Sequence, residues 1–365
     1  MTDLYKCAKK QLRKIYTLNM IGNLSIAGAA WVALLSARGF SMMEIMTAET
    51  VFHIVSIIAE IPSGMFADVF GRKKSLIVST IFSILSSIFM GFTDIYAGVI
   101  ASIACSALSW NFCSGTDNAL AFDSLKEADA IDEYERFSSI QTIIYRVGSS
   151  LSSLCVGLAL WMGNRNAQVL SIILAVIRLF IVFTMKENAV ILKKKTLGYG
   201  ERVRNLIKES IGFLKHNPRA SKIIFGNGLV GAVDVLLLFS LQDILQDAGV
   251  DKVWLGPLLF LTYLGGVFGA LAAPKVSSLK FGTLFAVTLA LVIAGSACAF
   301  TKIPWIMTLG GVVTAFSDDI IQIRADILLN QMVPEDSRAT LISVNSLCFS
   351  IIMIFLSPLA GWLFT

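Results

Sequence analysis

Eleven long apolar segments run through this chain of 365 residues, and each is close to the length that a helix needs to cross a lipid bilayer. A spanning helix takes about 20 mostly apolar residues. The segments cover approximately residues 15–37, 42–66, 74–92, 95–121, 138–162, 166–185, 221–243, 254–273, 281–300, 303–325 and 339–363. Charged residues make up only 15% of the chain, against about 25% in soluble domains. The sequence therefore predicts an all-α integral membrane protein.

The distribution of basic residues predicts how these helices are oriented. Residues 1–14 hold five basic residues and run into a long apolar segment without the pattern of a cleavable signal peptide. If the N-terminus is inside, the cytoplasmic segments hold 24 Lys and Arg and the outer loops hold 4. Because basic loops stay in the cytoplasm, we expect a multi-pass protein of the inner (cytoplasmic) membrane with a cytoplasmic N-terminus. The net charge of +5 lies in these loops, which argues against a nucleic-acid partner.

One long charged segment, residues 186–220, divides the apolar segments into six and five. Apolar residues recur in it at helical spacing with basic residues between them, which predicts an amphipathic helix that ends near Pro218. This helix would lie on the inner membrane surface or serve as a solvated linker helix. We therefore predict an N-terminal six-helix bundle over 1–187, a cytoplasmic linker over 188–220 and a C-terminal five-helix bundle over 221–365.

The turn after the second apolar segment carries the most specific motif. Residues 60–76 read Glu-Ile-Pro-Ser-Gly-Met-Phe-Ala-Asp-Val-Phe-Gly-Arg-Lys-Lys-Ser-Leu. The pattern Gly-x-x-x-Asp-x-x-Gly-Arg-Lys closely resembles the loop between helices 2 and 3 of the major facilitator superfamily. The stretches 114–127 and 329–340 also resemble segments of bacterial members, whereas the turn 274–282 lacks the Asp and Arg of the first motif.

The resemblance implies a fold and a mode of action. Members of this superfamily have two six-helix halves, bind substrate between them near the midplane, and alternate access by a rocking motion. The second half of this chain has only five apolar segments, so the twelfth helix is absent from the protein or the chain is shortened. The sequence leaves both alternatives open.

The resemblance also implies that the turn in 60–76 acts as a conformational latch between the two halves. Gly64 and Gly71 permit positive φ and close backbone approach, and Asp68 would accept hydrogen bonds from helix N-termini. We expect Arg72, beside Lys73, to pair with a carboxylate. The expected partners are Asp123 for Arg72 and the region of Ser337 and Arg338 for Asp68. The alternative is an ordinary basic turn.

Ionisable residues inside spans are costly and are usually functional or paired. Glu49 and His53 lie four residues apart and share a helix face. Together they could form a proton relay or a site for a cationic substrate, or they could be only a polar patch. Asp117 and Arg146 are expected to pair, unless one of them faces the cavity.

Asp234 lies near the middle of the seventh segment with no opposite charge close in sequence. A carboxylate in such a dry site holds a proton more readily than one in water, which suits proton coupling or cation binding; an interhelical strut is the alternative. Asp318 and Asp319 lie near the middle of the tenth segment, and at least one is expected to face the cavity. Asn23 and Asn111 supply neutral polar groups.

Several classes of function are disfavoured. The chain has no Gly-x-x-x-x-Gly-Lys-Ser/Thr sequence for ATP, no HExxH and no CxxC pair, so we expect no enzyme, no cofactor and no metal site. The fifth segment lacks the Gly-Pro-x-x-Gly-Gly element of drug antiporters. We predict a monomeric secondary transporter, in contact with membrane lipids, that exports a small cationic or amphipathic compound coupled to protons. The alternatives are an importer of a metabolite or lipid-like substrate, and a non-transporting sensor.

Overall fold

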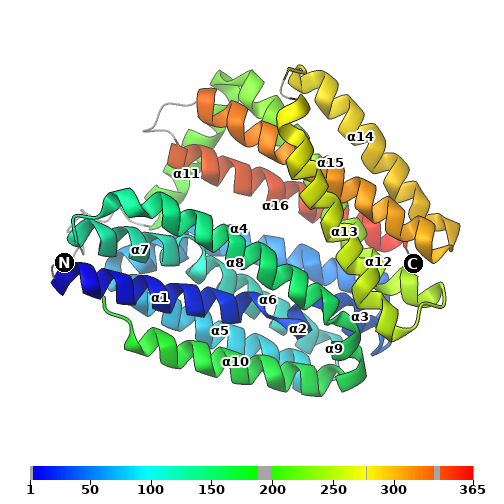
Figure 1. The fold of residues 1–365 in the computed structure, drawn as a ribbon, viewed down its shortest axis with the longest axis horizontal. Coiled ribbons are helices and arrows are strands. Elements are labelled where there is room, and N and C mark those ends of the chain that lie inside the picture. The colour runs from blue at the N-terminus through cyan, green and yellow to red at the C-terminus, as the bar shows by residue number, and fades with distance from the viewer. Residues whose placement is uncertain (1–2, 188–198, 277, 333–337, 365) are drawn as a thin grey trace. The chain divides into compact units, whose positions relative to one another are not determined.

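The computed structural model describes residues 3–187, 199–276, 278–332 and 338–364, and all the regular structure in these residues is helical (Figure 1). Within them, nine helices are long and apolar enough to cross a membrane. A tenth forms if 131–154 and 156–162, which meet at a bend of 49°, make one span. The prediction of an all-α membrane protein is confirmed.

The contacts divide the chain into two units. Unit 1 comprises 1–31 and 54–197, and unit 2 comprises 32–53 and 198–365. Residues 32–53 therefore pack with the second unit although they lie early in the sequence. Unit 1 holds α1 (Asp3–Asn23), α2 (Ile26–Ala29), α5 (Arg72–Phe92), α6 (Tyr96–Cys113), α7 (Thr116–Glu127), η1 (Ile131–Glu133), α8 (Tyr134–Leu154), α9 (Val156–Met162) and α10 (Asn164–Thr184). Helices α3 (Trp31–Ser36) and α4 (Met42–Phe70) contribute to both units.

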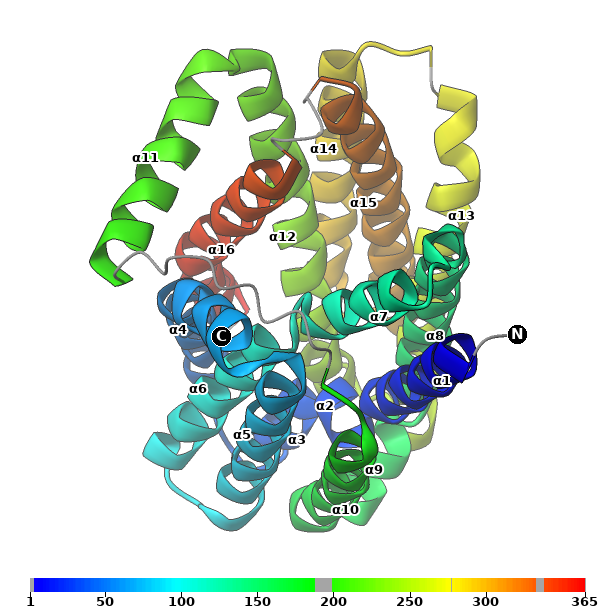
Figure 2. The ribbon, with the colours of Figure 1, turned by 90° about the vertical axis from the view of Figure 1, so that its left-hand side faces the viewer.

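Unit 2 contains the remaining helices. They are α11 (Tyr199–His216), α12 (Pro218–Asp247), α13 (Lys252–Ala272), η2 (Ala273–Val276), α14 (Phe281–Cys298), η3 (Ala299–Thr301), α15 (Pro304–Met332) and α16 (Arg338–Leu363). Figure 2 shows α12, α14 and α15 as neighbours. The predicted linker helix corresponds to α11. It ends before Pro218, and Phe213 and Leu214 pack against the core of unit 2. Many side chains of its first half lie outside the described residues.

The first apolar segment, which was expected to form one span over 15–37, is broken. Instead of one helix over 15–37, the chain forms α1, α2 and α3. The carbonyl oxygen of Asn23, which a continuous helix would use, accepts a hydrogen bond from Ser152 Oγ at 2.9 Å. Ser25 Oγ then accepts from Gly28 N at 3.2 Å and caps the next turn. Polar side chains at this point thus compete with the helical hydrogen bonds.

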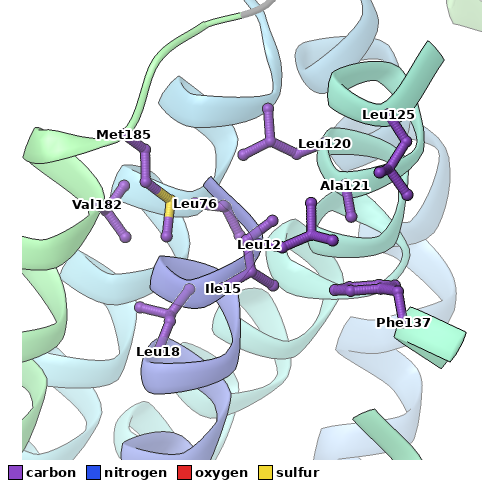
Figure 3. Packing of buried hydrophobic residues seen from close by; sticks show 10 residues of the cluster. All are labelled: Leu12, Ile15, Leu18, Leu76, Leu120, Ala121, Leu125, Phe137, Val182 and Met185. Atoms are coloured by element: carbon purple, nitrogen blue, oxygen red, sulfur yellow. The ribbon is translucent and has the colours of Figure 1, made fainter. Parts of the chain in front are cut away.

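A cluster of buried side chains fixes the rotation of α1 in unit 1 (Figure 3). Leu12, Ile15 and Leu18 recur on one face of α1 and are nearly inaccessible. They pack with Leu76 of α5, Leu120, Ala121 and Leu125 of α7, Phe137 of α8, and Val182 and Met185 at the end of α10. In a membrane, close packing of such side chains stabilises the unit through dispersion contacts, because lipid tails are as apolar as the side chains.

In unit 2, glycines let α13 and α15 approach closely. A Cβ atom at Gly265 would overlap the carbonyl oxygen of Val312, and one at Gly269 would overlap that of Phe316. Small residues at helix interfaces allow this approach in membranes, where dispersion contacts and hydrogen bonds drive association. The α13–α15 contact therefore depends on the absence of side chains at these positions.

We predict that Gly265→Ala lowers the free energy of unfolding by about 1–3 kcal/mol, because the added methyl group overpacks the α13–α15 interface. The thermal midpoint of the purified protein in detergent measures this. Gly282→Ala is the matched control, since a Cβ there meets nothing within 4 Å. Equal midpoints for the two variants would contradict the close-approach argument.

Candidate functional site

Unit 1 holds a polar cluster around Asp117. Its Oδ2 accepts a hydrogen bond from Asn19 Nδ2 at 2.7 Å, and its Oδ1 accepts from Asn118 N at 2.8 Å. Asp117 stands in the first turn of α7, where the helix dipole favours an anion. The cation near it is Arg178 of α10, whose guanidinium lies against Gly22: a Cβ there would be 3.1 Å from Arg178 Cζ.

This arrangement corrects the expected pairing of Asp117 with Arg146. Arg146 is exposed on α8, while the groups that surround Asp117 are Asn19, Asn118 and Arg178. The pairing inferred from sequence assumed that Asp117 and Arg146 meet because they lie at a similar depth in the membrane. The rotation of α1 and α10 instead brings Arg178 to Asp117. Sequence reasoning missed this role of Arg178, and only the adjacent small residue Gly22 could have suggested that space is kept for it.

The two asparagines predicted to line the site are engaged in hydrogen bonds. Asn23 lies at the end of α1, where its Nδ2 donates to Asn19 O at 2.9 Å. Asn111 of α6 donates to Ser56 Oγ and to Ala107 O, both at 2.9 Å. Both amides therefore keep their oxygen atoms as acceptors beyond these contacts.

In unit 2, Glu49 and His53 meet as their spacing predicted. His53 Nε2 lies 3.3 Å from Glu49 Oε1, and the exposed fractions of the two side chains are 7% and 12%. His53 Nδ1 lies 3.3 Å from Ser350 Oγ on α16, and the ring of Phe349 stands edge-on to the imidazole. The imidazole thus lies between a carboxylate and a hydroxyl, although its Nε2 makes no hydrogen bond to the described residues. No signal in the sequence identified Ser350.

The second polar cluster of unit 2 joins α12, α13 and α15. Asp234 lies close enough to Asp319 for the two carboxylates to repel one another when both are ionised. Asp319 is buried, and its carboxylate occupies space left by Gly266 of α13. The neighbouring Asp318 lies against Gly231 of α12, where a Cβ atom would be 3.0 Å from Asp318 Oδ1. The three aspartates, which come from the seventh and tenth segments, therefore lie where α12, α13 and α15 pack together.

Thr314 lies between this cluster and the backbone of α15. Its Oγ1 donates to Gly311 O at 3.0 Å and also hydrogen-bonds Asp234. A hydroxyl group carries one proton, so Thr314 can donate it either to Gly311 O or to the Asp234 carboxylate. Ionised Asp234 therefore competes with Gly311 for this proton. Thr314 was not identified from sequence, although its spacing of four from Asp318 places the two on one helix face.

The predicted latch turn connects α4 to α5. Arg72 Nη1 lies 3.3 Å from Asp68 Oδ1, across the turn at Gly71, which has φ +107°. Among the ion pairs of the described residues, Arg72 is joined to Asp68 and not to Asp123. The nearest carboxylate lies in the turn itself, so the motif pairs internally. The side chain of Arg338 lies outside the described residues, as does Ser337.

Two further observations revise the interpretation of this turn. Gly64 lies inside α4 with open space where a Cβ would be, so the expected positive φ and close approach occur at Gly71 alone. The anion at the N-terminus of α5 is Glu187, whose Oε2 and Oε1 accept from Lys73 N at 3.0 and 3.2 Å. The Lys73 Nζ atom donates to Phe183 O at 2.8 Å. The turn thus ties α5 to the end of α10, and sequence inspection missed Glu187.

No group of three or more His, Cys, Asp and Glu side chains suited to a metal ion occurs in the described part of the chain. The six cysteines are free and partly buried. The chemistry on which the site can draw is therefore that of carboxylates, one imidazole, guanidinium groups and neutral amides.

Comparisons with known proteins agree on the family. The sequence profile described as Major Facilitator Superfamily matches residues 15–316. An uncharacterized MFS-type transporter, YxaM of Bacillus subtilis (strain 168), is 24% identical over 335 residues, which cover 88% of this chain and 81% of the relative.

Solved structures share the fold at low identity. The nucleoside transporter NupG superimposes with a TM-score of 0.74 at 13% identity, covering 99% of this chain and 91% of its own. A bacterial homologue of the human lysosomal transporter Spinster, in an inward-facing and unoccupied conformation, superimposes with a TM-score of 0.71 at 17% identity. The match covers 98% of this chain and 82% of the homologue. A D-xylose–proton symporter superimposes with a TM-score of 0.66 at 14% identity, and the match covers 95% of this chain and 89% of the symporter.

We predict that Glu187→Ala lowers the free energy of unfolding by about 1 kcal/mol, because the N-terminus of α5 loses its anionic cap. Arg72→Ala should cost less, since exposed ion pairs contribute about 0–1 kcal/mol. Thermal midpoints of both variants in one detergent test this order. A larger loss for Arg72→Ala would contradict it, whereas slower transport by a stable Arg72→Ala would support the latch role.

Proposed function

The chain belongs to the Major Facilitator Superfamily, and we propose that this secondary transporter couples the export of a small cationic or amphipathic compound to protons. The observation that carries the proposal is the pair Asp234 and Asp319 inside unit 2. The predicted location is the cytoplasmic membrane with the N-terminus inside, on the strength of 24 basic residues against 4.

The carboxylate pair supports proton coupling on electrostatic grounds. Two ionised carboxylates in a poorly solvated site repel one another, and one bound proton relieves the repulsion. The hydrogen bond from Thr314 acts in the opposite sense, since it stabilises the ionised carboxylate of Asp234. A cationic substrate would stabilise the same pair as a proton does, so proton and cation would compete. Such competition is the basis of antiport, and it favours an exporter driven by proton entry.

Import is the second candidate, and the fold neighbours favour it. The matching structures include a nucleoside transporter and a D-xylose–proton symporter. Asn23 and Asn111 retain amide oxygens that could accept hydrogen bonds from the hydroxyl groups of a neutral polar solute. In that case substrate and proton would bind together and move in the same direction.

We predict that Asp234→Asn abolishes substrate-induced proton flux while the thermal midpoint stays equal or rises, because the amide removes the repulsion with Asp319. The measurement uses proteoliposomes of the purified chain challenged with cationic, zwitterionic, anionic and lipid-like compounds. Asp247→Asn, at the exposed end of the same helix, is the control and should keep wild-type flux. Unchanged flux in Asp234→Asn, or no response of the wild type to any class, would contradict proton coupling through this residue.

The direction of coupling has a test that does not depend on how the protein is oriented in the vesicle. Under antiport, vesicles with an acidic lumen accumulate the responding compound; under symport, vesicles in an acidic medium accumulate it. We expect accumulation against an acidic lumen. Accumulation from an acidic medium would replace export by import and leave the role of Asp234 in coupling intact.

A further inference from the structure

A groove of about 450 Å³ runs between α1 and α10 on the surface of unit 1. Its lining residues follow one face of each helix: Lys10, Arg13 and Lys14 on α1, and Ile177, Phe180 and Ile181 on α10. Spacings of three and four residues bring each set to one side of its helix. Figures 1 and 2 show α1 and α10 as neighbours. The groove therefore has a basic wall and an apolar wall.

The basic wall carries uncompensated charge. No ion pair among the described residues involves Lys10, Arg13 or Lys14, whereas the nearby Lys9 pairs with Glu133 at 2.7 Å. Burial, together with the neighbouring ammonium groups of Lys10, Lys73 and Lys186, lowers the pKa of Lys14. Among the described residues, no carboxylate forms an ion pair with these three side chains, and Glu187 is held on the backbone of Lys73.

The other polar groups of the groove are already used. Thr17 Oγ1 donates to Arg13 O at 2.9 Å, and Thr184 Oγ1 donates to Ile181 O at 2.7 Å, so both hydroxyl protons stay within their own helices. Lys14 Nζ donates one of its protons to Thr184 O. What the groove offers to a ligand is therefore a set of cationic donors, which selects for an anion.

The apolar wall indicates which anion. Phe180 is 67% exposed and Ile177 is 43% exposed, on a helix that is apolar enough to span the membrane. A soluble anion would leave these side chains uncovered, whereas a phospholipid places an acyl chain beside its phosphate. We propose that the groove binds an anionic phospholipid of the inner leaflet, with the headgroup on Lys10, Arg13 and Lys14 and an acyl chain on Ile177 and Phe180. Basic pockets between membrane helices on the cytoplasmic side suit such headgroups.

The test titrates phosphatidylglycerol or phosphatidylcholine onto the purified full-length chain and counts bound lipids by native mass spectrometry. Wild type should retain phosphatidylglycerol in preference to phosphatidylcholine. Each basic residue near an anionic surface contributes about 1 kcal/mol, or about a fivefold change in affinity. Lys10→Gln combined with Arg13→Gln should therefore weaken phosphatidylglycerol binding by about 25-fold, and Lys14 stays intact to preserve its contact with Thr184.

Lys275→Gln combined with Lys280→Gln is the charge-matched control, because both side chains are exposed elsewhere on the predicted cytoplasmic side; it should bind like wild type. The swap Lys10→Arg with Arg13→Lys should also bind like wild type, which separates loss of charge from misfolding. Phe180→Gln should weaken lipid binding while leaving the basic residues unchanged. Equal binding of the two lipids, equal losses in the control, or displacement by millimolar glycerol phosphate would overturn the proposal, the last by identifying a soluble-anion site.

Discussion

The cost of leaving a polar group unsatisfied in hydrocarbon governs this molecule. It forces the backbone of every spanning segment into helices and leaves polar side chains only where a partner or a function retains them. The Asn111 amide donates to Ser56 and to its own helix, and Asp117 sits among an amide, a helix N-terminus and a guanidinium. The same cost places the free basic residues at the ends of the helices, where the groove between α1 and α10 collects three of them.

The break in the first apolar segment shows how this constraint produces local structure. Asn23 has its carbonyl oxygen bound by Ser152 and its side chain bound to Asn19, so Ser152 competes with the next helical turn for this carbonyl. Below the break, Leu12, Ile15 and Leu18 hold α1 against its neighbours. Asn19 follows Leu18 by one residue and is thereby turned toward Asp117. Apolar packing thus positions the polar cluster, and the polar cluster ends the helix.

What the sequence could predict follows from the range of the interactions involved. Segment length and the 60–76 motif are local, and they predicted the helical membrane fold and the family. The four-residue spacing of Glu49 and His53 is also local, and it predicted their contact. The partners of Asp117, of the α5 N-terminus and of His53 come from residues far away in the chain: Arg178, Glu187 and Ser350. Their choice depends on how each helix is rotated, and no spacing rule specifies that. The helix break was missed because Asn23 looked like a residue facing a cavity, while its polar groups were needed by the backbone around it.

The two aspartate clusters differ in a way that bears on function. Asp117 accepts two hydrogen bonds and has a cation nearby, so its partners within unit 1 are fixed. Asp234 faces another carboxylate and a hydroxyl whose proton is also offered to Gly311. Two protonation states therefore call for two different hydrogen-bond arrangements at Thr314. A carboxylate with fixed partners stabilises one structure, whereas a pair that must rearrange when a proton leaves couples protonation to structure. Our proposal that a coupling proton binds in unit 2 rests on that difference.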